Sequence, residues 1–198
     1  GGYNGMGLTQ KMIDAYRMED GKTIEEAMAV GEYKEGPNDF TSGPRDFSDY
    51  HLNSGVWQMY ANREMRFYAC VGFNGCYWPA SSTTDGSYRL QTVKYCMDGN
   101  AGKYAGTVGS DNYTPTGYVI KKYISSYDAW RGNSSERYEK GFPIIRYAEI
   151  LLSYAEALNQ LTTTHAITLP TGESYSLSRD MNEIAKAFNQ VRYRAGLP

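Results

Sequence analysis

The sequence has few of the residues that most catalytic and metal sites require. Its 198 residues include only two histidines, His51 and His165, and no Gly-x-Ser-x-Gly motif. A Ser–His–Asp hydrolase is therefore not expected. The three cysteines, Cys70, Cys76 and Cys96, have the spacing of neither a zinc site nor a redox Cys-x-x-Cys motif. We expect small buried side chains there, with at most one disulfide, and we predict no metal and no cofactor.

The sequence lacks both an excess of one charge and long apolar runs. Lysine and arginine total 20 against 22 acidic residues, for a net charge of -2. The chain therefore has no basic surface of the kind that binds nucleic acid. It contains no apolar stretch of about 18 residues, the shortest length that crosses a bilayer as a helix. Residues 1–30 carry several acids and no apolar block, so they are not a signal peptide.

Aromatic residues, in contrast, are abundant. The chain has 19 Tyr, 6 Phe and 3 Trp, although its mean hydropathy is only -0.59. Much of this aromatic surface must lie near water, where rings on loops can stack on the C–H faces of sugars. The candidates in loop-rich regions are Trp57, Tyr77, Trp78 and Trp130. The competing interpretation, that each tryptophan belongs to the core, stays open because tryptophan is mostly buried.

Short elements and loops are expected in the first part of the chain, residues 1–141. Residues 9–16 are typical of a short helix, and Thr23 with Glu26 forms a capping box that opens a second. The β-prone segment 66–73, the turn dipeptide Asn74-Gly75 and residues 76–78 together predict a hairpin. Further β-prone pieces lie at 88–95 and 117–124, and irregular loops are expected at 31–53 and 98–116.

A helical hairpin is expected over residues 142–198. Pro143 is suited to open a helix over 143–158, and a final helix is capped by Asp180 with Glu183 and stopped at Gly196. Apolar residues recur at helical spacing in both, which predicts a core position for Tyr147, Tyr154 and Phe188, with the helices packed through small residues such as Ala155 and Ala185. The pair resembles a tetratricopeptide unit, but the connection 162–177 is longer than in that repeat and no array follows.

Two segments of this hairpin resemble the SusD/RagB family. They are FPIIRYAEILLSYAEALN at 142–159 and NQVRYRAGLP at 189–198. Weaker matches at 15–22, 62–67 and 116–123 follow in the order of the family. The chain has Asn-Arg-Glu-Met-Arg at 62–66, where the family usually has Asn-Arg-Asp-Pro-Arg. Residues 1–198 are thus expected to be a single SusD/RagB-like region, a fragment covering much of the C-terminal half.

The resemblance implies a fold and a function. The fold would be mainly α, a tetratricopeptide-like α-α superhelix with irregular loops and small β-hairpins. Members of the family are nutrient-binding outer-membrane lipoproteins of Bacteroidetes. A member would bind polysaccharide or oligosaccharide at the cell surface and pass it to a SusC-like TonB-dependent transporter, without catalysis. Its contact with the membrane would be an N-terminal lipid anchor that this chain lacks.

Two other classes of function remain as alternatives. A peptide-binding or protein-interaction scaffold would use the groove of a helical pair. A glycoside hydrolase would need two carboxylates on facing walls of a cleft. The clusters that could be nominated are Glu19-Asp20, Glu25-Glu26 and Asp46-Asp49. All three lie in polar surroundings without an apolar pocket to raise a pKa, so the hydrolase is the less favoured alternative.

Overall fold

The computed structural model of the chain describes residues 6–36, 45–47, 50–105 and 112–198, with the backbone alone at 45–47, 50 and 51. The chain divides into two compact units, Gly1–Lys140 and Gly141–Pro198.

Two short helices begin the first unit, α1 (Gln10–Asp14) and α2 (Ile24–Ala29). The Thr9 hydroxyl accepts a hydrogen bond from the Met12 amide and so caps α1. The predicted capping box is confirmed at α2, where Thr23 and Glu26 accept hydrogen bonds from each other's backbone amides. Local sequence alone determines these two helix starts.

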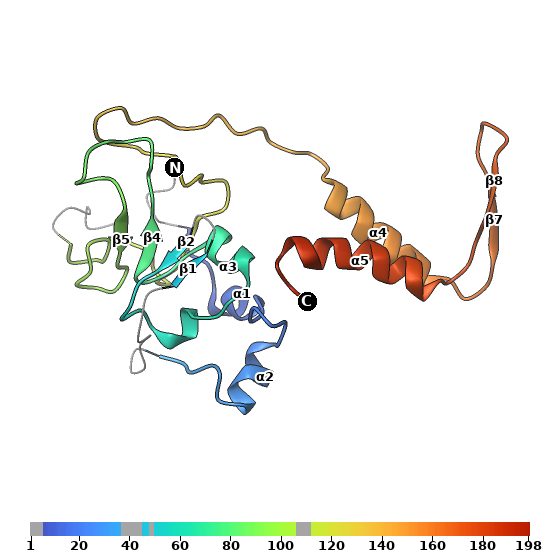
Figure 1. Cartoon of the computed structure of the whole chain (residues 1–198), viewed down its shortest axis with the longest axis horizontal. Coiled ribbons are helices and arrows are strands. Elements are labelled where there is room, and N and C mark those ends of the chain that lie inside the picture. Colours follow the sequence, from blue (N-terminus) through green and yellow to red (C-terminus); the bar gives the residue numbers. More distant parts are fainter. Residues whose placement is uncertain (1–5, 37–44, 48–49, 106–111) are drawn as a thin grey trace. The chain divides into compact units, whose positions relative to one another are not determined.

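The strands of the first unit form a four-stranded antiparallel sheet and a separate pair (Figure 1). The sheet has the order β1 (Arg45–Phe47), β2 (Tyr50–Leu52), β4 (Cys76–Trp78) and β5 (Gln91–Val93). The pair joins β3 (Val71–Gly72) to β6 (Val119–Ile120). The loop expected over 31–53 therefore contains two strands, while the β-prone pieces at 88–95 and 117–124 are strands only at β5 and β6.

The hairpin predicted across Asn74-Gly75 is wrong. Gly75 does lie in a turn, with φ +85°, but β4 pairs with β2 and β5, and β3 pairs with β6. Most of the β-prone segment is the helix α3 (Met65–Cys70). The helical turn buries both Phe67 and Tyr68, which a strand would point to opposite faces. Tertiary burial has overridden the β propensity of these aromatic residues.

An aromatic cluster fills the core of the first unit. The Phe67 ring is fully buried, 5.2 Å from the ring of Phe73 and 5.9 Å from that of Tyr16. Tyr60, the last residue of the 3-10 helix η1 (Gln58–Tyr60), lies 4.6 Å from Phe73 and donates its hydroxyl toward that of Tyr118. Burial raises the pKa of Tyr60 above its ordinary value. This cluster accounts for part of the high aromatic content.

Arg63 is buried inside this unit, only 1% exposed. Its guanidinium donates hydrogen bonds to three backbone carbonyls, those of Met59 at 3.1 Å, Ile13 at 2.6 Å and Tyr16 at 2.9 Å. It also lies 4.6 Å from the centre of the Phe67 ring. Burial lowers its pKa, yet an arginine side chain stays protonated in proteins. Arg63 thus joins the end of α1 to η1 and α3.

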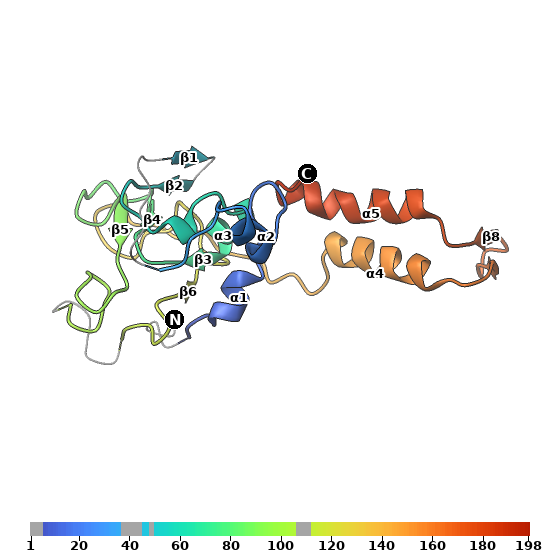
Figure 2. The same ribbon diagram turned by 90° about the horizontal axis from the view of Figure 1, so that it is seen from below.

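The second unit is a helical hairpin with a β-ribbon in its connection. The helices α4 (Tyr147–Gln160) and α5 (Met181–Arg194) lie side by side in both views (Figures 1 and 2). Between them, β7 (His165–Thr168) pairs antiparallel with β8 (Ser174–Leu177). Asp180 caps α5 as predicted, accepting from the Asn182 and Glu183 amides. The predicted start at Pro143 is wrong, because α4 begins at Tyr147.

Most of the predicted apolar stripe lies at the surface. Tyr147 is 71% exposed, Tyr154 42% and Phe188 45%, so their expected core positions are wrong. The two helices meet instead at smaller side chains, and the buried residues of the unit are Ala155, Leu158, Ala187, Ala195 and Leu197. Ala185 is exposed. One helical pair offers too little surface to cover two wide apolar faces.

Most of the described residues lie outside helices. Neither a superhelix nor a mainly α class is therefore confirmed.

A pair of substitutions tests this burial pattern. Leu158 is 4% exposed, and Leu158→Ala is expected to lower the stability of the helical hairpin by about 2–4 kcal/mol. Phe188→Ala removes a ring that stays in contact with water and should cost about 1 kcal/mol. Thermal unfolding of the 198-residue chain, followed by circular dichroism, measures both. A larger loss of stability on Phe188→Ala than on Leu158→Ala would contradict this burial pattern.

Among the described residues, no helix is long and apolar enough to cross a membrane.

Candidate functional site

The structure places the four predicted aromatic residues in different environments, all in the first unit. Trp57, Tyr77 and Trp78 are half-buried, whereas Trp130 is 69% exposed. Each of the four has contacts of its own.

Trp57 packs on the core. It precedes η1, and its ring stacks on that of Tyr60 with centroids 5.8 Å apart and planes inclined by 19°. One face of the indole is thus covered by a buried tyrosine. This geometry supports the interpretation of Trp57 as a core residue.

Trp78 and Tyr77, on β4, are held by structural contacts. The Trp78 indole N–H donates to the Cys76 sulfur at 3.2 Å. The Nζ of buried Lys121 donates to the Tyr77 carbonyl at 3.0 Å and lies 5.2 Å from the centre of the Trp78 ring. Burial lowers the pKa of Lys121. Trp78 is thus held between a buried cysteine and a buried lysine.

Trp130 has the geometry of a ligand-stacking residue. Among the contacts of the described residues, one covers its ring: the guanidinium carbon of Arg137 lies 4.6 Å from the ring centre. Arg137 is itself exposed. An indole with a cation on one face and water elsewhere can accept a flat ligand without disturbing the core.

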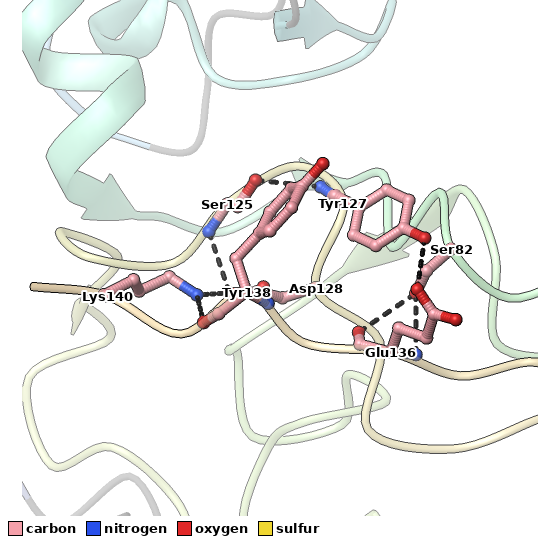
Figure 3. A network of polar contacts seen from close by, with 7 residues as sticks. All are labelled: Ser82, Ser125, Tyr127, Asp128, Glu136, Tyr138 and Lys140. Carbon is pink, nitrogen blue, oxygen red and sulfur yellow. Dashed lines mark hydrogen bonds and ion pairs between the residues drawn. The ribbon is translucent and has the colours of Figure 1, made fainter.

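Backbone hydrogen bonds hold residues 125–140, here called the Trp130 loop, in a defined shape. The Ala129 amide donates to the Glu136 carbonyl at 2.9 Å, which brings Trp130 and Arg137 side by side. Ser82, which is not part of this loop, holds it in place. Its hydroxyl donates to the Glu136 carbonyl and accepts from the Glu136 amide, both at 3.1 Å (Figure 3). The Thr83 hydroxyl donates to the Asn133 carbonyl at 2.9 Å. The two exposed side chains therefore project from a braced loop.

The buried carboxylate of Asp128 anchors the Trp130 loop. Asp128 is 7% exposed and accepts hydrogen bonds from the amides of Ser125 at 3.0 Å and Tyr138 at 2.9 Å, and from the Lys140 ammonium (Figure 3). Burial by itself raises the pKa of this carboxyl, but the hydrogen bonds from Lys140 and the two amides outweigh it, so the pKa lies below its usual value.

Gly132 allows the loop to approach its neighbours. Its φ is +94°, a conformation that other residues rarely adopt. A Cβ there would come within 2.3 Å of the Thr83 hydroxyl. A glycine is therefore required where the loop passes over Thr83.

A family model and a solved structure identify the family. The model described as the SusD family matches residues 1–198. The chain belongs to the SusD family. The structure of a SusD-like protein from Bacteroides fragilis superposes with a TM-score of 0.58 at 26% sequence identity. The match covers 100% of this chain and 30% of that protein, so the chain spans about a third of its length. A comparison with curated proteins finds no match.

Glu64 and Met65, which depart from the usual SusD-family motif, have defined places in the local structure. Glu64 is 1% exposed and accepts hydrogen bonds from the Arg17 amide at 3.1 Å and the Arg66 Nε at 2.8 Å. Met65 then begins α3. The expected strand after this motif starts only at Val71, because a helix follows first.

In this SusD-family chain, the sequence offers Trp130 as one of four stacking candidates, and it gives no signal for Asp128, Arg137 or Ser82. The polar run between Trp130 and Arg137 indicates a loop, yet the pairing of Ala129 with Glu136 has no sequence signal. The contacts of Ser82 join residues 54 positions apart, which a single sequence does not reveal.

Two of the carboxylates nominated for hydrolysis, Asp20 and Glu26, have structural roles. Asp20 pairs with Lys22, whose hydrogen bonds lower the carboxyl pKa. Glu26 completes the capping box, and hydrogen bonds from Thr23 lower its pKa. A general acid needs a raised pKa. The Asp46 side chain and Asp49 lie outside the described residues.

Cysteine and metal chemistry is not evident in the described part of the chain. Cys70, Cys76 and Cys96 are all free, with Cys76 buried and the other two half-buried. The described residues contain no group of three or more histidine, cysteine and acidic side chains that could hold a metal ion.

Proposed function

We propose that this protein binds glycans at the cell surface and delivers them to a SusC-like TonB-dependent transporter, as a nutrient-binding lipoprotein of the outer membrane and without catalysing a reaction. Membership of the SusD family over residues 1–198 supports the class of function. The exposed indole of Trp130 on its braced loop is the observation that carries the glycan-binding site.

The mechanism follows from surface chemistry. A pyranose ring presents a face of C–H groups that packs on an indole, while its rim of hydroxyls needs hydrogen-bond partners. Trp130 supplies an apolar face, and the guanidinium of Arg137, 4.6 Å from the ring centre, supplies donors beside it. Because the loop is held by Ser82, Thr83 and Asp128, little order has to be gained on binding.

Trp130→Ala tests the site. Loss of the stacking surface is expected to weaken glycan binding about tenfold, because aromatic stacking of this kind contributes roughly 1–1.5 kcal/mol. The measurement is calorimetric titration of the intact natural protein with a panel of soluble polysaccharides. Tyr104→Ala is the matched control, since Tyr104 is also 69% exposed and has a lysine Nζ 6.0 Å from its ring centre. Equal affinities for both variants would remove Trp130 from the site.

The same titrations separate the alternatives. Newly released reducing ends in the mixtures would indicate a glycoside hydrolase and contradict the proposal. A peptide-binding scaffold has the groove between α4 and α5 in its favour, about 290 Å³ in volume and lined by residues such as Tyr147 and Tyr154. It predicts binding of peptides and no response of affinity to Trp130→Ala.

A further inference from the structure

We propose that the Trp130–Arg137 pair selects acidic glycans, with Arg137 binding a uronate carboxylate while Trp130 stacks on the same sugar. This inference rests on the proposed function and names the substrate class of its site. It is carried by the position of the guanidinium, 4.6 Å from the centre of an exposed indole, and by its lack of a paired carboxylate among the described residues.

Two of the three acids of the Trp130 loop are already engaged. Asp128 is buried and paired with the Lys140 ammonium. Glu136 accepts a hydrogen bond of 2.5 Å from the Tyr127 hydroxyl, whose ring lies 4.7 Å from that of Tyr138 (Figure 3). Among the described residues, no contact joins either carboxylate to Arg137.

Arg137 therefore keeps its charge and donors available. Within the described residues, its guanidinium makes no hydrogen bond and no ion pair, and its one contact of this kind is with the Trp130 ring. The remaining charged residues of the loop are Arg131 and Glu139, both exposed. The loop is neutral overall, with three acidic and three basic side chains, so Arg137 is distinguished by its free guanidinium beside the indole and not by a surplus of charge.

The chemistry of this pair matches a uronic acid. A guanidinium presents a planar fork of donors that fits a carboxylate with two parallel hydrogen bonds. Its stacking on an indole holds the fork in place at the ring. A uronate residue carries its carboxylate at the rim of a sugar ring whose C–H face can lie on Trp130. A neutral sugar would leave the fork with hydroxyls as weaker partners.

The test compares acidic polysaccharides with their own neutral forms. Polygalacturonate, alginate and hyaluronan are titrated into the intact natural protein beside carboxyl-reduced samples of the same polymers. We expect at least one acid form to bind about tenfold more tightly than its reduced form, with the preference declining as salt is raised. Arg137→Met should abolish that preference, because it weakens binding of the acid form far more than binding of the reduced form.

A matched variant separates Arg137 from the general charge of the loop. Arg131→Met removes one positive charge from the same loop and should preserve the preference. Equal loss of preference in both variants would overturn the assignment to the Trp130–Arg137 pair, as would acid forms that bind no better than reduced ones. Retained binding of neutral glycans, sensitive to Trp130→Ala, would in those cases leave the proposed function intact. Absence of glycan binding altogether would overturn both.

Discussion

Replacing Arg63 by methionine is expected to lower the free energy of unfolding of the first unit by about 3–5 kcal/mol. Methionine keeps much of the apolar stem but leaves the carbonyls of Met59 and Tyr16 without a donor, at about 1–3 kcal/mol for each unpaired group. It also removes the cation above the Phe67 ring. Relief from burying a charge offsets part of this cost.

Tryptophan fluorescence reports this unit selectively, because all three tryptophans of the chain lie within residues 1–140. Urea unfolding followed by this signal therefore measures the effect of Arg63→Met. Arg89→Met is the matched control, since Arg89 is exposed, and it should change stability by less than about 0.5 kcal/mol. Equal stability of Arg63→Met and the natural protein would contradict this prediction. The free energy lost by burying the Arg63 charge would then equal the free energy gained from its hydrogen bonds.

Asp128→Asn is expected to destabilise the first unit by about 2–3 kcal/mol at neutral pH. The amide keeps the shape of the side chain but cannot accept from the Lys140 ammonium and both backbone amides as a carboxylate does. Because the loop loses its anchor, Trp130 and Arg137 should become less well placed. Glycan affinity is then expected to fall together with stability.

The Asp128 effect should depend on pH with a defined sign. Its folded pKa lies below the ordinary value of 3.8. The folded state therefore gains stability from this carboxylate above that value, and loses it as pH falls through the lowered pKa. The difference in unfolding free energy between the natural protein and Asp128→Asn should be largest near neutral pH and shrink below pH 3.8.

Glu139→Gln is the control for this pH dependence. Glu139 is an exposed acid in the same loop, so its substitution should leave the pH profile of stability unchanged. A difference between the natural protein and Asp128→Asn that stays constant from neutral to acid pH would contradict the role given to the ion pair with Lys140.

Local sequence signals predicted the structure correctly wherever contacts between neighbouring residues decide it. The Thr23 capping box and the Asp180 cap are both present where predicted, because each depends on contacts within three residues. The turn at Gly75 follows from the conformational freedom of glycine. The two family segments likewise pointed to the family that the comparisons show.

The predictions that were wrong concern burial and pairing. Residues 66–70 are helical because that arrangement buries Phe67 and Tyr68 in an aromatic cluster. Periodicity placed Phe188 on an apolar face, but periodicity does not say whether another element covers that face.

The sequence by itself therefore determined the family, the capped helix starts and the presence of an aromatic residue at position 130 in a polar loop. Tertiary structure decided which tryptophan is exposed. Trp57 is covered by Tyr60, and Trp78 is held beside Lys121, whereas Trp130 stands clear beside Arg137. The physical reason is that exposure depends on contacts between residues far apart in the chain, such as the clamp from Ser82 to Glu136.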